Sequence, residues 1–199
     1  MPPASSASES RNRPSAGTLR NAERIADHAG YVVANTGRNG YYGTAETMFW
    51  LRRTFDVLAT ERPGAARPQI RDISVKAGGR PAGSWPHSSH QSGRDVDITY
   101  PRPACDATTG CPLGTVTPST YDAAATWLML ETWLVNNAAR RIFIDQSLHP
   151  SLKAQARARG HSEAKIQQWF GPVIQHITNH ANHLHVRFAC PADDSACIP

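Results

Sequence analysis

The sequence lacks a long apolar run. None of its 199 residues belongs to a stretch that approaches the roughly 20 apolar residues of a membrane-spanning helix, so no integral membrane segment is expected. The first residues, Met-Pro-Pro-Ala-Ser-Ser, also lack the charged start and apolar core of a signal peptide. We expect either that an export signal has been removed from this sequence or that export uses another route.

Cysteine is scarce, with four residues in all. None lies in a Cys-x2-Cys knuckle, which excludes a structural zinc site of that kind. Four cysteines allow three pairings, and we expect the two local ones, Cys105 with Cys111 and Cys190 with Cys197, because each pair flanks a short polar loop with turn residues. Disulfides indicate a periplasmic or secreted protein.

Nucleic-acid motifs are absent, although the net charge is +5 and the sequence pI is about 9.3. A basic surface can favour nucleic acid, an anionic membrane or an anionic cell wall, or can serve solubility alone. Because Lys and Arg are scattered rather than clustered, we expect no nucleic-acid partner.

Two histidine-rich segments lie almost a hundred residues apart, at residues 86–99 and 180–186. In the first, Asp95-Val96-Asp97-Ile98 alternates acidic and β-branched residues, so a strand here places both carboxylates on one face and both apolar side chains in the core. Gly93 accepts backbone angles that other residues resist, so the turn that contains it can fold His90 back toward these carboxylates.

The second segment carries His183 and His185 two residues apart, with apolar residues alternating to the opposite face of an expected strand. If the two strands are neighbours, His90, Asp97 and His185 bring together two nitrogens and one carboxylate oxygen. That set suits a tetrahedral zinc ion whose fourth position is left to water. Isolated histidines are usually surface or core residues, but five of the nine histidines fall within these two segments.

The wider pattern resembles the penicillin-insensitive murein endopeptidases, within the zinc peptidase superfamily that also groups lysostaphin-type endopeptidases, D-Ala-D-Ala peptidases and the hedgehog signalling domain. The resemblance runs from about Tyr31 to the end. It is carried by Asn39-Gly40-Tyr41-Tyr42-Gly43, Asp72-Ile73-Ser74 with Gly78-Gly79, His87-Ser88-Ser89-His90-Gln91-Ser92-Gly93-Arg94-Asp95-Val96-Asp97-Ile98, and His183-Leu184-His185-Val186-Arg187-Phe188-Ala189-Cys190-Pro191.

The resemblance implies one zinc ion per chain, bound by His90, Asp97 and His185. It places His183 and His180 in the active site with His87 close by, and the Cys190–Cys197 pair recurs in the family. The implied reaction is hydrolysis of peptide cross-links in peptidoglycan at the D-alanyl to meso-diaminopimelate bond.

The general base is expected among the histidines. Some relatives place a carboxylate just before the final histidines, where this sequence has Asn182. The base is therefore His183 or His180, and we favour His183 because it shares a strand face with His185.

Four further residues are given supporting roles. His87 can donate to the tetrahedral intermediate, and Asp95 can orient a ligand imidazole through its other nitrogen. Arg94 and Arg187 can pair with a substrate carboxylate, although a solvated arginine is the commoner outcome.

The pattern of elements predicts an α+β fold: a small mixed, mainly antiparallel sheet with helices on one side and the zinc site on the sheet face. We expect a flexible leader at 1–17 without core residues and a single zinc peptidase domain at 18–199. Expected helices span 18–28, 44–60 with Thr44 as N-cap, 121–135 capped by Ser119-Thr120, 150–159 and 162–170. Expected extended segments are 31–33, 69–75, 95–98, 141–145 and the final His-x-His strand, while 101–118 is a surface insertion.

Two alternatives to a murein endopeptidase remain open. A D,D-carboxypeptidase or dipeptidase requires a closed pocket for a free C-terminal carboxylate. A non-catalytic zinc module for wall or partner binding is allowed by the hedgehog resemblance, although His183 argues against it. The sequence does not predict an oligomeric state.

Overall fold

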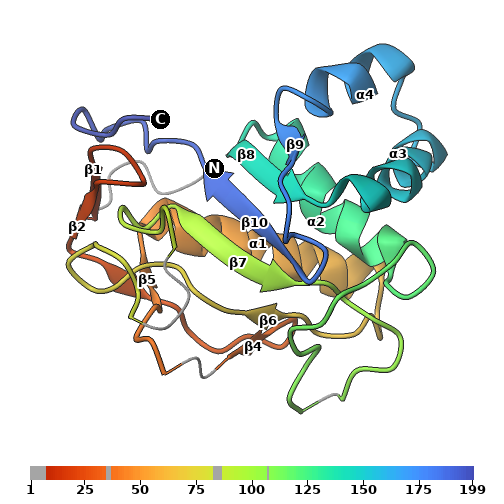
Figure 1. Cartoon of the computed structure of the whole chain (residues 1–199), viewed down its shortest axis with the longest axis horizontal. Coiled ribbons are helices and arrows are strands. Elements are labelled where there is room, and N and C mark those ends of the chain that lie inside the picture. Colours follow the sequence, from red (N-terminus) through yellow and green to blue (C-terminus); the bar gives the residue numbers. More distant parts are fainter. Residues whose placement is uncertain (1–7, 35–36, 83–86, 107) are drawn as a thin grey trace.

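The computed structural model describes residues 8–34, 37–82, 87–106 and 108–199. Its centre is a six-stranded sheet with the strand order β4-β6-β7-β10-β8-β9 (Figure 1). Its strands are β4 Val32–Val33, β6 Gln69–Ile70, β7 Asp95–Thr99, β8 Ala139–Ile144, β9 Ile174–His176 and β10 His183–Phe188. Neighbours are antiparallel except in the pairs β4 with β6 and β8 with β9, so the predicted mixed, mainly antiparallel sheet is confirmed.

The two long helices, α1 (Ala45–Glu61) and α2 (Ala123–Val135), lie behind the sheet in the view of Figure 1 and contact each other. After β8 the chain forms a short 3₁₀ helix, η1 (Gln146–Leu148), then α3 (His149–Ala158) and α4 (Glu163–Trp169), and α3 packs on α2. Helices α1 and α2 therefore cover only one face of the sheet. The histidine-rich strands β7 and β10 lie at the middle of the sheet, and their polar side chains can point to the other face. No helix in the described part of the chain is both long enough and apolar enough to cross a membrane.

Helix α1 begins where the sequence predicts. The side chain of Thr44 accepts a hydrogen bond from the backbone N–H of Thr47 at 3.2 Å, which satisfies one of the donors left free at a helix start. Met48, Leu51 and Phe55 follow at helical spacing and are buried in the core.

Helix α2 is buried on nearly all sides, as its apolar composition predicts: Trp127 and Trp133 are both fully buried. Its N-cap is Asp122 rather than Ser119-Thr120, because the Asp122 carboxylate accepts from the N–H of Ala125 at 2.9 Å. The helix stops at Asn137, whose φ of 52° is incompatible with continuation.

The prediction of a flexible leader is wrong for residues 8–17, whereas residues 1–7 lie outside the described residues. Strand β1 (Glu9–Arg11) pairs with β2 (Thr18–Arg20), and the Ser10 N–H donates to the Asp194 carboxylate at 2.6 Å. This segment is ordered by hydrogen bonds to the far end of the chain rather than by apolar burial, so a test of apolar periodicity does not detect it.

Two further predictions are corrected at the start of the domain. Residues 18–28 form no helix, because their backbone is used in β2 and in β3 (Glu23–Arg24), which pairs with β5 (Tyr42–Gly43). The strand predicted over 69–75 is regular only at β6, although the backbone of Arg71 and Asp72 still exchanges hydrogen bonds with Asp97.

Both local disulfides predicted from the sequence are present, Cys105–Cys111 and Cys190–Cys197. The first lies in the segment 101–118, which contains no named helix or strand among its described residues, in agreement with the predicted insertion. The second closes the C-terminal loop, which lies beside β1 in Figure 1. There the Asn12 N–H donates to the Ala196 carbonyl, and the Ile198 N–H donates to the Asn12 carbonyl.

Candidate metal centre

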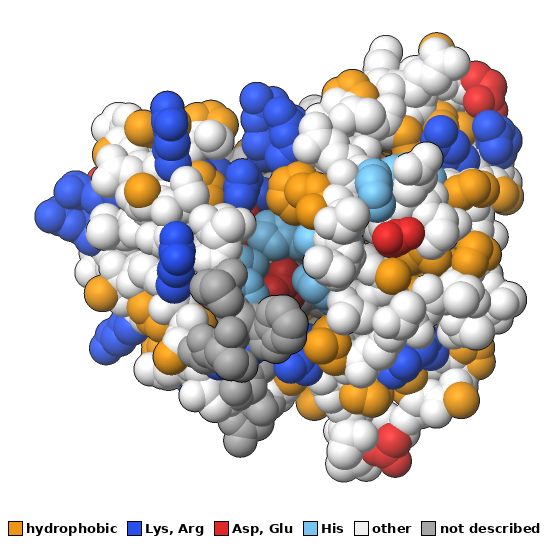
Figure 2. Space-filling view, viewed as in Figure 1, with side chains coloured by type: hydrophobic (Ala, Val, Ile, Leu, Met, Phe, Trp, Pro, Cys, Tyr) orange, Lys and Arg blue, Asp and Glu red, His pale blue; other side chains and the backbone are white. Residues whose placement is uncertain are grey.

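Strands β7 and β10 lie side by side and bring the two histidine-rich segments together. Their antiparallel register sets His185 opposite Asp97. Val96, Ile98, Leu184 and Val186, which alternate with the polar residues, are fully buried on the helix side. The alternation therefore turns the carboxylates and imidazoles to the open face, where Figure 2 shows histidines around an acidic side chain on the floor of a hollow.

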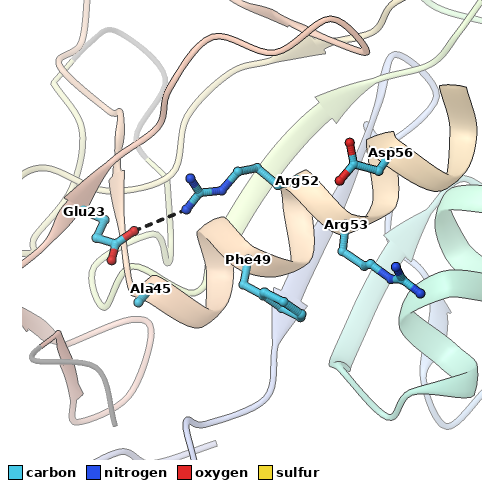
Figure 3. A pocket seen from close by; sticks show the side chains of 6 residues that line it. All are labelled: Glu23, Ala45, Phe49, Arg52, Arg53 and Asp56. Carbon is cyan, nitrogen blue, oxygen red and sulfur yellow. Dashed lines mark ion pairs between the residues drawn. The ribbon is translucent and has the colours of Figure 1, made fainter. Parts of the chain in front are cut away.

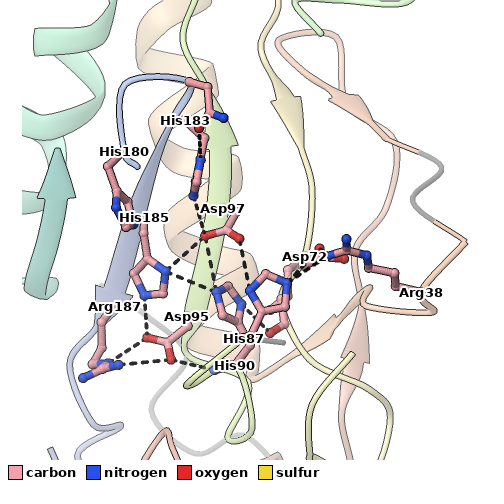
Figure 4. Close-up of polar contacts among 12 residues, drawn as sticks. Arg38, Asp72, His87, His90, Asp95, Asp97, His180, His183, His185 and Arg187 are labelled. Carbon is pink, nitrogen blue, oxygen red and sulfur yellow. Dashed lines mark hydrogen bonds and ion pairs between the residues drawn. The ribbon is translucent and has the colours of Figure 1, made fainter. Parts of the chain in front are cut away.

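Three donor atoms converge at this floor (Figure 4). His90 Nε2 lies 3.2 Å from His185 Nδ1 and 3.3 Å from Asp97 Oδ1, and the latter two atoms are 3.1 Å apart. A metal ion bound tetrahedrally at about 2.0–2.1 Å holds its ligand atoms roughly 3.3–3.4 Å apart. The triangle formed by these donors therefore fits such an ion.

A second, overlapping set can also hold a metal ion: His87, His90 and Asp97 offer ligand atoms that all lie within 4.8 Å of one another. His87 reaches the cluster from the side, with Nδ1 3.7 Å from Asp97 Oδ2. His90 and Asp97 are common to both sets, and His87 and His185 are the alternatives for the third position.

The turn before β7 aims His90 at the cluster. His90 itself has φ 67° and Gly93 has φ 75°, so the chain reverses sharply here. The His90 N–H donates to the Asp95 carboxylate at 3.0 Å, and the ring Nδ1 donates to the carbonyl of Ile73 at 3.0 Å. With its proton on Nδ1, the ring presents the Nε2 lone pair to Asp97 and His185.

His185 is oriented from behind in the same manner. Its Nε2 lies 3.1 Å from Asp95 Oδ1, and the carboxylate of Asp95 also accepts from Arg187 Nε at 2.7 Å. Burial lowers the pKa of His185, but the carboxylates of Asp95 and Asp97 more than compensate and raise it to about 9. Asp95 thus holds the imidazole so that Nδ1 faces the cluster.

His183 and His180 flank the cluster. His183 Nε2 lies 3.6 Å from Asp97 Oδ1, while its Nδ1 donates to the side-chain oxygen of Asn182 at 2.6 Å. Burial lowers the pKa of His183 to about 4, so its imidazole is neutral near pH 7. The ring of His180 lies 4.8 Å from that of His183, and burial also lowers its pKa.

Arg94 does not reach the cluster, and its predicted role in binding a substrate carboxylate is wrong. Its side chain is 0% exposed and donates to Ser10 Oγ at 3.1 Å, to the Phe188 carbonyl at 3.0 Å and to the Ile198 carbonyl at 2.8 Å. Burial lowers its pKa to about 10, which leaves it charged at neutral pH. Arg187, by contrast, lies at the cluster but is already paired with Asp95.

The site also contains two residues for which the sequence analysis predicts no role. Asp72 Oδ2 lies 3.0 Å from His87 Nε2, and Arg38 donates to the same oxygen at 2.9 Å. Asp72 belongs to the motif Asp72-Ile73-Ser74, yet nothing in its local pattern indicates that it lies behind His87.

A separate cavity of about 420 Å³ lies on α1 (Figure 3). It is lined by Glu23, Ala45, Phe49, Arg52, Arg53 and Asp56 and includes none of the histidine and aspartate residues of the cluster.

The structure is thus an α+β domain whose sheet carries, on its open face, buried histidine and aspartate side chains that could hold a metal ion. A model of the family described as penicillin-insensitive murein endopeptidase matches residues 12–199, and the chain belongs to this family. The family resemblance given by the sequence motifs is thus confirmed.

Three relatives carry that name. The chain is 28% identical to the penicillin-insensitive murein endopeptidase of Klebsiella pneumoniae over 182 residues, covering 84% of this chain and 61% of the relative. The corresponding values are 27% over 186 residues, 86% and 62% for Yersinia enterocolitica, and 27% over 178 residues, 84% and 61% for Escherichia coli O157:H7. The chain therefore spans about three-fifths of the length of these curated relatives.

Proposed function

We propose that this protein is a zinc metallopeptidase that hydrolyses peptide cross-links in peptidoglycan, at the D-alanyl to meso-diaminopimelate bond. The observation that carries the proposal is the triangle of His90 Nε2, Asp97 Oδ1 and His185 Nδ1, with edges of 3.1–3.3 Å. Membership of the murein endopeptidase family supports the substrate class.

The proposed zinc ligands are His90, Asp97 and His185. Two imidazole nitrogens and one carboxylate oxygen are a typical catalytic zinc set, because three protein ligands leave a position open. When bound, zinc polarises a carbonyl and brings the pKa of water toward 7. The protein supplies the orientation of each ligand through the bonds from Ile73 and Asp95 on the far side of the two imidazoles.

His183 is the proposed general base. The hydrogen bond to Asn182 keeps the proton on Nδ1, so Nε2 presents a lone pair toward the cluster. A neutral imidazole can accept a proton from water and later return it to the leaving amine. Asn182 thus takes a supporting part at the position where some relatives have a carboxylate.

His180 and His87 complete the proposed acid–base group. The carbonyl of His180 accepts from the Tyr100 hydroxyl at 2.9 Å, and the His180 ring Nδ1 donates to the Thr178 carbonyl at 3.0 Å, so the ring is held against His183. His87 lies on the opposite side of Asp97, with its Nδ1 3.7 Å from Asp97 Oδ2, and is the third member of this group.

The proposed compartment and partner follow from the same features. We assign a periplasmic or secreted location, supported by two disulfides. The partner is the peptide cross-link of the wall polymer. The predicted peptidase domain of residues 18–199 is extended in this proposal to Ser8, whose hydroxyl accepts from the N–H of Ala45 at 2.8 Å at the start of α1.

The decisive experiment is mass spectrometry of cross-linked muropeptide dimers incubated with the protein. We expect disaccharide-peptide monomers as products, loss of cleavage after treatment with a chelator, and recovery on addition of zinc. His90→Ala is the matched negative variant, because it lacks one proposed ligand.

The same digestion separates the alternatives. Release of only terminal D-alanine or a dipeptide from monomers would instead indicate a D,D-carboxypeptidase or dipeptidase. Intact dimers together with zinc-dependent retention on isolated wall would indicate a binding module.

A further inference from the structure

Asp72 is held rigidly behind His87. Its backbone carbonyl accepts from the N–H of Asp97 at 3.0 Å, and the N–H of Arg71 donates to the Asp97 carbonyl at 2.9 Å, so Asp72 sits beside the strand that carries a proposed ligand. Its side chain is only 4% exposed. A Cβ at Gly40 would lie 2.8 Å from Asp72 Oδ1, so the carboxylate is packed closely against the backbone of Gly40.

The carboxylate of Asp72 is ionised in this position. Burial raises its pKa, but the hydrogen bond from His87 and the charge of Arg38 contribute to an opposite effect that lowers the pKa below its ordinary value. Oδ2 accepts from Arg38 Nη1 at 2.9 Å and from His87 Nε2 at 3.0 Å. The buried anion is therefore compensated by His87 on the side of the cluster and by Arg38 on the other side (Figure 4).

This contact decides where His87 carries its proton. The Nε2 of His87 lies 3.0 Å from Asp72 Oδ2 and 3.1 Å from Arg38 Nη1. An ionised carboxylate only accepts hydrogen bonds, and Arg38 Nη1 already donates to Oδ2 at 2.9 Å, so a proton on Nε2 lets His87 donate to Asp72 as well. The opposite tautomer would direct a nitrogen lone pair at the carboxylate oxygen. With the proton on Nε2, the Nδ1 lone pair points to the other side of the ring, where Asp97 Oδ2 lies 3.7 Å away.

We propose that Asp72 is a positioning residue that fixes His87 in its Nε2–H tautomer and thereby presents the Nδ1 lone pair to the metal cluster. Arg38 holds the carboxylate in place by binding the same oxygen. The inference rests on the proposed peptidase function, and it deepens that function.

The first test is spectroscopic. Long-range ¹H–¹⁵N correlation spectra of the ¹⁵N-histidine-labelled, zinc-loaded protein report which nitrogen of each imidazole carries the proton, with His87→Ala used to assign the resonances. We expect His87 to be protonated on Nε2 in the parent protein, and to move toward the mixed tautomers of a free imidazole in Asp72→Ala. A parent His87 protonated on Nδ1 would overturn the inference.

A matched control comes from the Asp56–His28 pair, which has the same Nε2-to-carboxylate contact at 3.1 Å but lies on the surface outside the cluster. Asp56→Ala should alter the His28 resonances and leave those of His87 and the cleavage rate unchanged.

The second test is kinetic. Asp72→Ala should lower kcat on muropeptide dimers about 10- to 100-fold, as is usual for a carboxylate behind a site histidine, with zinc content and KM retained. In the His87→Ala background the same substitution should cause no further loss, because Asp72 acts through His87. Additive losses in the double variant would refute a positioning role.

The two tests also separate this inference from the proposed function. A parent protein that cleaves no dimer refutes the proposed peptidase, while the spectra still decide the tautomer of His87. A parent that cleaves dimers, beside an Asp72→Ala variant with unchanged rate and spectra, refutes the inference alone. Should Asp72→Ala fail to fold, Asp72→Leu keeps a similar volume but removes both acceptor oxygens; unchanged kcat and unchanged His87 resonances in that variant would equally refute it.

Discussion

The two imidazoles of the cluster are each oriented by a hydrogen bond on the ring side that faces away from the cluster. The carboxylate of Asp97 is oriented by its position in strand β7. His90 is held by the Ile73 carbonyl and His185 by Asp95, while Asp97 is fixed within β7. Preorganisation of this kind limits the conformational entropy lost when a metal binds. It also makes the contribution of individual residues testable.

Substitution of His90, Asp97 or His185 by Ala should abolish tight zinc binding, because only two of three ligands would remain. The measurement is elemental analysis after dialysis, with His28→Ala as a control that retains zinc, since His28 is outside the cluster. Full zinc content in His185→Ala, combined with loss of zinc in His87→Ala, would show that the overlapping set with His87 is the true ligand set.

His183→Ala should leave zinc bound and the fold intact, because His183 is assigned no coordination bond. Cleavage should nonetheless fall on the order of a hundredfold or more, since proton transfer is lost. Rates on muropeptide dimers and zinc content are measured together. Near-normal cleavage with zinc retained would mean that another residue is the base, and loss of zinc would make His183 a ligand.

The sequence predicted that Asp97 and His185 lie together on one face of the sheet, and the structure places them there, because alternation within a strand decides which side chains share a face. It could not place Arg94, since arginine is usually solvated. In this fold the guanidinium is enclosed by three carbonyl and hydroxyl groups from Ser10, Phe188 and Ile198, which come from both ends of the chain. The role of Asp72 was not predicted either, because only the tertiary structure brings Asp72 behind His87.

At the level of elements, the long helices were predicted accurately, whereas several two- and three-residue strands were not. Helix α1 follows from its Thr44 cap and apolar spacing. The two-residue strand β3 carries too little pattern to be recognised, and its pairing with β5 depends on residues distant in sequence. Strand β6 was predicted, but as the longer segment 69–75. The cap of α2 was misplaced because Ser119, Thr120 and Asp122 are all good N-cap residues and stand within four positions.

The assignment of Asp122 as the N-cap of α2 can be tested by measuring the free energy of unfolding. Asp122→Ala should lower the free energy of unfolding by about 1 kcal/mol through loss of the N-cap bond to Ala125. Its ion pair with Arg62 is partly exposed and should add little. Denaturant unfolding of Asp122→Ala is compared with Ser119→Ala, which should change stability by less than about 0.5 kcal/mol. A larger loss in Ser119→Ala would restore the cap predicted from the sequence.

On the scale of the whole molecule, the described C-terminal residues are tied to the segment around Asn12 beside strands β7 and β10. Asn12 donates to the Ala196 carbonyl at 2.8 Å, and Ile198 donates to the Asn12 carbonyl at 3.2 Å. The buried Arg94, next to β7, joins both segments to the end of β10. The Cys190–Cys197 disulfide closes the loop that makes these contacts, whereas Cys105–Cys111 closes a loop in the surface insertion.

Because only the loop closed by Cys190–Cys197 makes these contacts, removing the two disulfides should lower the free energy of unfolding by unequal amounts. Their sequence separations are 7 and 6, so loop closure alone gives both about 2 kcal/mol of stability in the chain-entropy description. Replacing Cys190 and Cys197 by Ser should cost roughly 1 kcal/mol more than replacing Cys105 and Cys111, because the contacts of Asn12 and Arg94 with the C-terminal loop loosen as well. Denaturant unfolding of the two zinc-loaded double variants, with equal m-values as the check on two-state behaviour, measures the difference. An equal or smaller loss in the Cys190/Cys197 variant would show that hydrogen bonds alone hold the two ends together.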